Sequence, residues 1–373
     1  DNSTVETVIQ MQQIRELPLD TRNPLGLVSL VPGMIYQGTT VGSFRDSFVQ
    51  GNGLSNNRTN FQLDGLTSNT SSSEGGTAIP NVDAIQEFSV QSVNSGAEQG
   101  RDPTQVLAIT KAGTNEFHGT LFEFNQNDLF SARNAFALKK NRIRYNQFGG
   151  TLGGPIVRNK TFLFGSYQQT VIGNDVVFNQ YVVTPEMKAG DFSALSTPII
   201  NPYTHTPFSG NIIPQSMINN ASKYFLDYFT TPNSPGQYFK ALAKAPNITH
   251  EYVGRIDHQI TPAQHIFARF AYIREPITVI GYRPSVQSSN TTTEPSLGGS
   301  YTWTISPKTL LTLTGGFMRD AFTYNNPALG KQNDSELAGI QGIPSAGREA
   351  WIGPPAVGVS GYQAFSFGGG GYG

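Results

Sequence analysis

The sequence predicts a mixed fold: a small α+β domain over residues 1–115, followed over residues 116–373 by antiparallel strands of an incomplete transmembrane β-barrel. Three observations predict it. Strand-like runs of roughly ten residues follow residue 116, and each alternates between apolar and polar side chains. The connections between these runs are short and long in strict alternation. No apolar run approaches the about 20 residues of a transmembrane helix, so a chain that crosses a membrane has to do so with strands.

The composition agrees with a chain of many strands and polar loops. Charged residues make up 14% of the 373 residues, against about 25% in an average globular protein. Phenylalanine and tyrosine are frequent, which argues against a disordered chain. The net charge is -1 and the basic residues are scattered, so we expect no nucleic-acid partner. Cysteine is absent, which excludes a disulfide framework and a thiolate metal site.

The first domain is predicted as short strands separated by helical turns. Asn23 and Pro24 are typical of the cap and first position of a short helix within Thr21–Gly33. Asp64-Gly65 predicts a turn. The predicted strands are Val5–Gln10, Arg58–Gly65, Thr104–Gly113 and the part of Ile79–Val93 that follows one helical turn.

The second domain is predicted to contain about seven barrel strands. These are Gly119–Asn125, Tyr145–Ile156, Thr161–Val171, Tyr252–Ile260, His265–Ile273, Leu297–Ile305 and Thr309–Met318. An arginine or lysine on the lipid face at mid-bilayer costs about 2–4 kcal/mol. We therefore expect lipid to contact the apolar alternating residues. The polar face is expected to carry Glu123, Arg255, Asp257 and Arg269.

Connection lengths separate a barrel from a β-sandwich, because one-sided alternation fits both. Val157–Lys160, Thr261–Gln264 and Ser306–Lys308 are short. The other connections are long, and residues 172–250 include an expected short amphipathic helix, Lys223–Thr230. Up-and-down strands with this rhythm place all short turns at one end and all long loops at the other, as transmembrane barrels do.

Several segments, in order along the chain, resemble TonB-dependent outer-membrane receptors of the Oar-like group. They are Glu16–Met34, Asn56–Asn69, Ile79–Arg101, Thr110–Phe124, Asn146–Tyr167, Ala189–Leu195, Phe208–Pro214 and Val253–Tyr272. The resemblance implies a plug, residues 1–115, inside a barrel of about 22 strands. Because Asp1 is not a methionine and the chain stops within a glycine-rich stretch, we expect a fragment of a longer protein.

The resemblance also implies a function in the bacterial outer membrane. The plug would face the periplasm, the long loops would be extracellular, and outer-membrane lipid would surround the wall. A TonB–ExbB–ExbD complex would drive uptake of a large or scarce ligand through an N-terminal element outside this chain. Siderophore, cobalamin, oligosaccharide and peptide ligands remain open. The alternative is a surface-exposed or secreted β-rich adhesin or glycan-binding module without transport activity.

The sequence predicts no catalytic, cofactor or metal site, so we expect no enzyme and no cofactor, and it assigns no ligand-binding residue. A β-sandwich glycan hydrolase is disfavoured because no carboxylate pair stands out. The five histidines lack zinc-site spacing, and the Gly51–Asn56 segment lacks the lysine of a phosphate loop. Four acids fit no calcium loop and are interpreted as caps, turns or plug–barrel ion pairs: Asp64, Asp83, Glu87 and Glu98. Arg58 and Arg101 are expected to meet carboxylates of the barrel wall.

Overall fold

The chain is described by a computed structural model in two compact units. The first comprises Asp1–Gly173, Pro246–Ile277 and Thr291–Thr323, and the second comprises the remaining segments. The described residues are 5–9, 19, 22–37, 48–55, 58–69, 79–93, 102–133, 135, 140, 142, 144–173, 175–244, 246–279, 288–325, 331–342, 352–353, 355, 357–358 and 362. Among them, no helix has the length and apolar character needed to cross a membrane.

The N-terminal α+β part, which keeps here the name plug domain that the resemblance implies, is built on a five-stranded sheet in the order β1-β6-β7-β4-β5. Its strands are β1 (Val5–Ile9), β4 (Thr59–Leu63), β5 (Leu66–Thr67), β6 (Ile85–Val93) and β7 (Thr104–Thr110). β4 and β7 are parallel, and the other neighbours are antiparallel. A separate hairpin pairs β2 (Met34–Gln37) with β3 (Phe48–Gly51). The predicted strands of this domain are confirmed.

The predicted helix start in the plug domain is also confirmed, although the helix is of the tighter 3-10 type. The element η2 spans Pro24–Leu30, and the Asn23 side chain accepts a hydrogen bond from the Leu25 amide. Proline suits the first position because its missing amide hydrogen would have no helical partner there. The predicted single turn before β6 is the 3-10 helix η5, Val82–Ala84, capped by Asn81.

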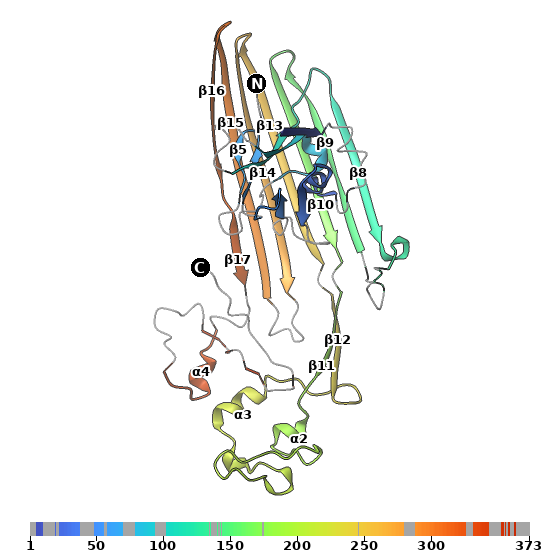
Figure 1. Ribbon diagram of the computed structural model, residues 1–373, viewed down its shortest axis with the longest axis vertical. Coiled ribbons are helices and arrows are strands. Elements are labelled where there is room, and N and C mark those ends of the chain that lie inside the picture. The colour runs from blue at the N-terminus through green and yellow to red at the C-terminus, as the bar shows by residue number, and fades with distance from the viewer. Residues whose placement is uncertain are drawn as a thin grey trace. The chain divides into compact units, whose positions relative to one another are not determined.

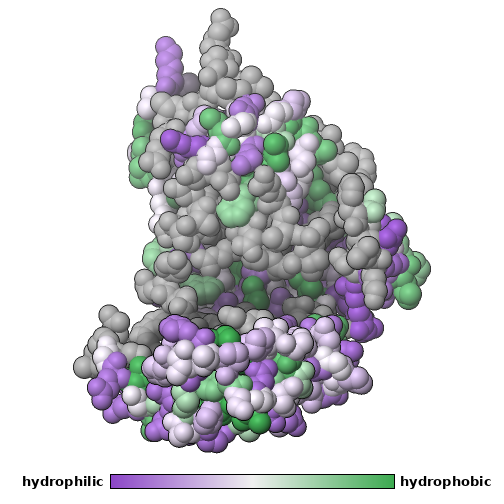
Figure 2. All heavy atoms as spheres, turned by 60° about the horizontal axis from the view of Figure 1, so that its bottom comes forward, coloured by the Kyte–Doolittle hydropathy of each residue, from purple (hydrophilic) through white to green (hydrophobic). Residues whose placement is uncertain are grey.

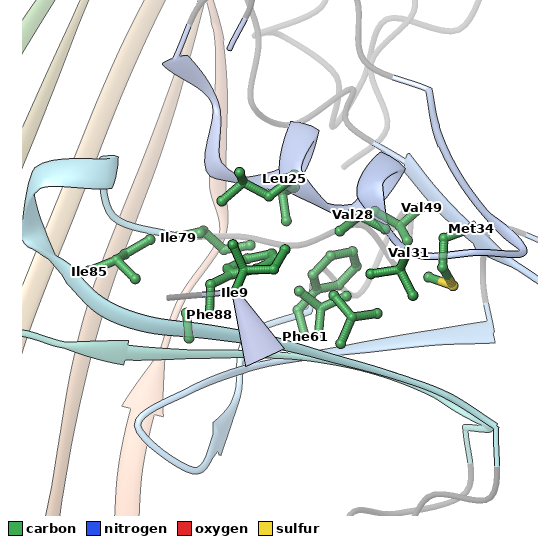
Figure 3. Close-up of a cluster of buried hydrophobic side chains, with 14 of the residues drawn as sticks. Ile9, Leu25, Val28, Val31, Met34, Val49, Phe61, Ile79, Ile85 and Phe88 are labelled. Carbon is green, nitrogen blue, oxygen red and sulfur yellow. The ribbon is translucent and has the colours of Figure 1, made fainter. Parts of the chain in front are cut away.

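One hydrophobic core holds the plug domain together. Apolar side chains from η2 and from the sheet meet there, and Figure 3 shows Leu25 and Val28 packed above Phe61 and Phe88. These four side chains are at most 1% exposed. Burying each one contributes about 1.5–3 kcal/mol, so the core fixes η2 on one face of the sheet.

The barrel part forms an eight-stranded sheet. Seven of its strands follow one another in the order β16-β15-β14-β13-β10-β9-β8, and the eighth, β17, pairs with β15. The strands are β8 (His118–Asn127), β9 (Arg144–Val157), β10 (Thr161–Ile172), β13 (Asn247–Thr261), β14 (Gln264–Val279), β15 (Ser288–Ser306), β16 (Thr309–Met318) and β17 (Ala321–Asn325). All seven predicted strands are present, and the predicted short turns lie between β9 and β10, β13 and β14, and β15 and β16.

The elements of the plug domain lie against one face of this wall, here called the inner face (Figure 1). Ala84 of η5 packs with Phe164, Val253 and Ala271 of the wall, which are all nearly completely buried. The opposite, outer face is apolar and exposed, as predicted for β9 and β13 to β16. Its large exposed side chains include Leu152, Phe270, Leu297, Leu313 and Phe317.

One face assignment is wrong: β8 is turned over relative to the expectation. Thr120 faces Thr151 of the inner face, with the two hydroxyl oxygens 2.8 Å apart. Phe122 and Phe124 share this side, and Glu123 therefore lies on the outer face, opposite Phe148. The expectation that apolar side chains face lipid fails here because the two phenylalanines pack against the plug domain, where an arginine side chain stacks on their rings.

The second unit contains helices and a hairpin that the sequence analysis partly anticipated. α2 (Pro185–Lys188), α3 (Asn220–Leu226) and α4 (Asp334–Leu337) accompany the 3-10 helices η8 (Ser209–Asn211) and η9 (Gln215–Met217). β11 (Asp175–Tyr181) pairs with β12 (Tyr238–Lys244), a hairpin not predicted. α3 confirms the expected amphipathic helix, although it begins earlier.

The second unit also has its own apolar core. Val183, Met187, Phe225, Phe229 and Ala338 are buried together there. Hydrophobic and hydrophilic residues are intermixed on the face shown in Figure 2.

Candidate functional site

Asp64 of the plug domain occupies the tip of the β4–β5 hairpin and is the centre of the candidate site. The turn is sharp, with φ of 52° at Asp64 and 79° at Gly65, a conformation that aspartate and glycine tolerate better than other residues. The carboxylate accepts hydrogen bonds from the Thr110 amide at 2.9 Å and from the Thr110 hydroxyl at 2.9 and 3.1 Å. These bonds hold the side chain in one orientation.

Two arginines of the wall reach this carboxylate. Asp64 Oδ2 lies 2.9 Å from Arg269 Nε, and Asp64 Oδ1 lies 3.2 Å from Arg255 Nη1. The side chains of Asp64, Arg269 and Arg255 are 2%, 1% and 11% exposed. The three charges are therefore almost fully removed from solvent, where an unpaired charge is expensive.

The strand register places both arginines on the inner face beside each other, since Arg255 of β13 is paired directly with Arg269 of β14. Asp257 binds Arg255 in a bidentate manner, with both nitrogen–oxygen distances at 2.9 Å. The Arg255 guanidinium carbon also lies 4.3 Å from the centre of the Phe267 ring. Because two arginines balance two aspartates, the cluster has no net charge when His265, 3.4 Å from Asp257, is neutral.

Glycines in the wall make room for the hairpin next to this cluster. A β-carbon on Gly298 would lie 2.5 Å from the Leu66 side chain and 2.9 Å from Arg269 Nη2. A β-carbon on Gly316 would lie 2.6 Å from the same leucine side chain. Only glycine at both positions allows the hairpin to approach this closely.

Arg22 makes a second contact between the plug domain and the wall. Its Nη2 atom lies 2.6 Å from Asp83 Oδ2 within the plug domain. The guanidinium carbon lies 3.8 Å from the Phe124 ring centre and 5.7 Å from that of Phe122. This cation–π geometry fastens the plug domain to β8.

Asn81 makes a third contact, because its side-chain amide donates to the Ser166 hydroxyl at 3.2 Å. Together, the three contacts attach one α+β domain to four different strands of the wall. In the described part of this interface, charged contacts and hydrogen bonds occur beside a small buried apolar cluster around Ala84.

The residues singled out in the sequence have different outcomes. Of the three interpretations left open for Asp64, the turn and the plug–barrel ion pair both apply, whereas Asp83 pairs within the plug domain. Glu87 is exposed on β6. Arg58 makes no ion pair with any described residue, so its expected wall contact is wrong. Glu98 and Arg101 lie outside the described residues.

The segment Gly51–Asn56 begins in a turn, with positive φ at Asn52 and Gly53. Within the described part of the chain, no group of three or more His, Asp or Glu residues could hold a metal ion. The histidines lie on strands or in a loop of the second unit, and His258 Nδ1 is 2.9 Å from the Thr161 hydroxyl oxygen.

Sequence reasoning placed Arg255 and Arg269 on the polar face but did not predict their plug partner. The available signal was two arginines at polar-face positions of consecutive strands, which require a buried or solvated counter-charge. Pairing them with the Asp64-Gly65 turn needed the three-dimensional position of the hairpin.

Comparisons with known proteins agree with this architecture. The profile of the family described as outer membrane beta barrel domain matches residues 109–373. The chain is 26% identical over 156 residues to the TonB-dependent transporter Oar of Myxococcus xanthus, an alignment that covers 39% of this chain and 14% of Oar.

Solved structures show the same fold. The outer membrane transporter YddB of Escherichia coli is similar with a TM-score of 0.58 and 10% identity, over 87% of this chain and 40% of YddB. The siderophore receptor PirA of Acinetobacter baumannii is similar with a TM-score of 0.51 and 13% identity, over 84% of this chain and 39% of PirA. The chain thus spans well under half the length of these relatives.

Proposed function

Because the chain belongs to the outer membrane beta barrel domain family, we propose that it supplies the plug and the first wall strands of a TonB-dependent receptor. The receptor takes up a large or scarce ligand across the bacterial outer membrane with energy from the TonB–ExbB–ExbD complex. In this proposal residues 1–115 are the plug and residues 116–373 are the beginning of the barrel. The relatives are described as transporters or receptors, and we assign the chain no catalytic role.

The observation that supports this proposal most strongly is the buried ion cluster between Asp64, Arg255 and Arg269. A wide barrel needs a plug to prevent leakage, and the plug has to leave its seat when a ligand passes. Charged and hydrogen-bonded contacts suit this task because water can replace them when they separate. A large greasy interface would lose its stabilisation on exposure without such replacement.

We place the short turns Val157–Lys160, Thr261–Gln264 and Ser306–Lys308 at the periplasmic side. The long connections then face the outside and meet the ligand first. The coupling complex engages an N-terminal element of the complete receptor. Siderophore, cobalamin, oligosaccharide and peptide remain candidate ligands.

Growth and fractionation of the source bacterium test the proposal. A strain that lacks the complete gene should lose uptake of one solute from a nutrient panel, and a strain without TonB should lose the same uptake. The protein should sediment with outer membranes. Recovery of the protein from culture supernatant alone, or unchanged uptake of every solute, contradicts the proposal and supports an adhesin.

A further inference from the structure

A regular grid of polar side chains occupies the inner face of β9, β10 and β13, on the extracellular side of the plug contacts under the proposed orientation. The register sets Gln168 opposite Glu251 and sets Thr170 between Gln147 and Thr249. The next inner-face position of β13 is Asn247, opposite Ile172. None of these residues takes part in the ion cluster around Asp64, although Glu251 also contacts Asn81 of the plug domain.

The grid is buried although its residues are polar. Gln147 is 0% exposed, Gln168 and Glu251 are 1% exposed, and Asn247 is 9% exposed. Two bonds join grid members: Gln168 Nε2 donates to Glu251 Oε1 at 2.9 Å, and Gln147 Nε2 donates to Thr170 Oγ1 at 3.4 Å. Asn81 of the plug domain contacts Glu251 through its backbone and its side chain, and its side-chain amide also donates to the Ser166 hydroxyl.

Hydrogen-bond acceptors in the grid outnumber their donors. Gln147 Oε1, Gln168 Oε1, Asn247 Oδ1 and Glu251 Oε2 have no hydrogen-bond partner among the described residues. Amide oxygen and nitrogen can be exchanged in a structure. In the observed orientation Gln168 Nε2 donates to Glu251 Oε1. Gln168 Oε1 is then a buried acceptor without a donor, and Glu251 is approached by Asn81 of the plug domain, a contact that is lost when the plug moves.

Buried acceptors without donors cost free energy unless water or a ligand satisfies them. Several water molecules can do so while the plug is seated. Once the plug moves, a solute that carries many donors can replace that water on the same atoms. An anionic solute cannot, because the grid offers it acceptor oxygens and contains no cation.

We propose that this grid is a transit site for a neutral, hydroxyl-rich solute of the oligosaccharide class. The inference rests on the proposed transport function and specifies the ligand for it. Sugar hydroxyl groups donate to Gln168 and Glu251 on the inner face, and the amides of Gln147 and Asn247 extend the same surface toward the outside. The grid acts after capture, since it is covered while the plug is seated.

Uptake by cells that produce the complete receptor tests this assignment. The probes are radiolabelled dextrins and their O-methylated counterparts, which keep the size and lose the donors. Gln168→Met removes the acceptor at similar volume, and Gln147→Met is a second variant at a neighbouring position. Gln169→Met is the matched control, since Gln169 is adjacent in sequence and lies on the outer face. Heat-modifiable gel migration verifies that each variant forms a barrel.

The receptor should take up dextrins in preference to the methylated probes. Gln168→Met should lower the maximal uptake rate about fivefold to tenfold, leave the half-saturation concentration unchanged, and reduce the preference for free hydroxyl groups. A variant that only disturbs plug seating slows both probes equally. Gln169→Met should match the parent. Glu251→Gln, which keeps an acceptor at a binding position, should lower the uptake rate less than Gln168→Met does.

Three results overturn the transit site. The first is equal uptake by the Gln168→Met and Gln169→Met receptors. The second is abolition of uptake by Glu251→Gln, which indicates a cationic solute. The third is receptor-dependent uptake of an anion in place of dextrin. The last result leaves the transport proposal intact. Only the absence of receptor-dependent uptake of any solute contradicts both.

Discussion

Replacement of Asp64 by asparagine tests whether the ion cluster holds the plug in its seat. The change keeps the shape of the side chain and removes its charge. Arg255 and Arg269, paired directly in the register, would then share only Asp257. Each lost contact, at 2.9 and 3.2 Å, has a gross Coulomb energy of about 5 kcal/mol at an effective dielectric constant near 20.

Desolvation of the separated charges cancels much of that gross energy. Removal of one partner of a buried pair costs about 3–5 kcal/mol, because the remaining charge is left uncompensated. The side chains here are 1% to 11% exposed, so the full range applies. We expect the free energy of plug release to fall by about 3–5 kcal/mol in the Asp64→Asn receptor.

A cysteine in place of Ser68 measures plug release. Ser68 is 3% exposed and its hydroxyl lies 3.7 Å from the Met318 sulfur of the wall. Its reaction with a water-soluble maleimide over a urea series gives the midpoint of release. Arg269→Met provides the second arm of a double-mutant cycle, and the double variant should be more stable than the sum of the single changes predicts. A release midpoint that Asp64→Asn leaves unchanged, or strict additivity, refutes the reasoning.

Further predictions concern other contacts. A cysteine at Leu152, 64% exposed on the outer face, should react slowly with the same maleimide in intact membranes, and one at Thr151 should react faster once urea has released the plug. Arg22→Met should ease plug release by about 1–3 kcal/mol in the urea assay, through loss of the ion pair and the ring contact. Gly298→Val should destabilise the receptor by about 1–3 kcal/mol, because the valine side chain collides with the plug hairpin. The temperature at which heat abolishes the gel shift of the folded barrel should therefore be lower than in the parent. Tyr224→Phe should destabilise the second unit by about 1–3 kcal/mol in thermal melts, since it removes the 2.6 Å bond from the tyrosine hydroxyl to a buried carboxylate.

The tyrosine contact also makes stability depend on pH. Burial, and then the hydrogen bond to Asp334, raise the pKa of Tyr224, and burial raises the pKa of Tyr228. A raised pKa stabilises the fold below the unfolded value of about 10, and this contribution is lost as the pH rises through the folded pKa. Melts of the parent should therefore weaken above pH about 10, and those of Tyr224→Phe should weaken less. Equal alkaline sensitivity in both proteins argues against this explanation.

The wall could be predicted strand by strand because burial on one face and exposure on the other impose a period of two on the sequence. Thr309–Met318 matches β16 at both ends. The rule fails at β8, where both faces carry large apolar groups. Leu121 is 94% exposed on the outer face, and Phe122 and Phe124 face an arginine. Alternation alone cannot distinguish apolar side chains that face lipid from aromatic ones that face a cation.

The hairpin β11–β12 was missed for a different reason. A hairpin is recognised in a sequence when a turn dipeptide joins two adjacent strand-like runs, and residues 172–250 contain no such pattern. The strands Asp175–Tyr181 and Tyr238–Lys244 are instead separated by the helices of the second unit. Pairing over such a distance depends on packing that a local pattern does not encode. The same limit applied to the candidate site: the polar face held both arginines, but their partner Asp64 lies 191 residues before Arg255.

Under the proposed function, the composition of the plug seat makes a plug that is both firmly held and removable. Among the described residues, the buried apolar cluster shared by plug and wall comprises Ala84, Phe164, Val253 and Ala271, and it is small beside the plug's internal core. The plug therefore stays folded through its own core, and its seat depends on the cluster around Asp64. A force applied to the plug can exchange these ion pairs for water at a modest net cost, while unfolding of the core would expose far more apolar surface. Rearrangement of the plug at its seat should thus precede its global unfolding, and hydrogen exchange at Phe61 and Phe88 should stay slow under conditions that make a cysteine at position 68 reactive.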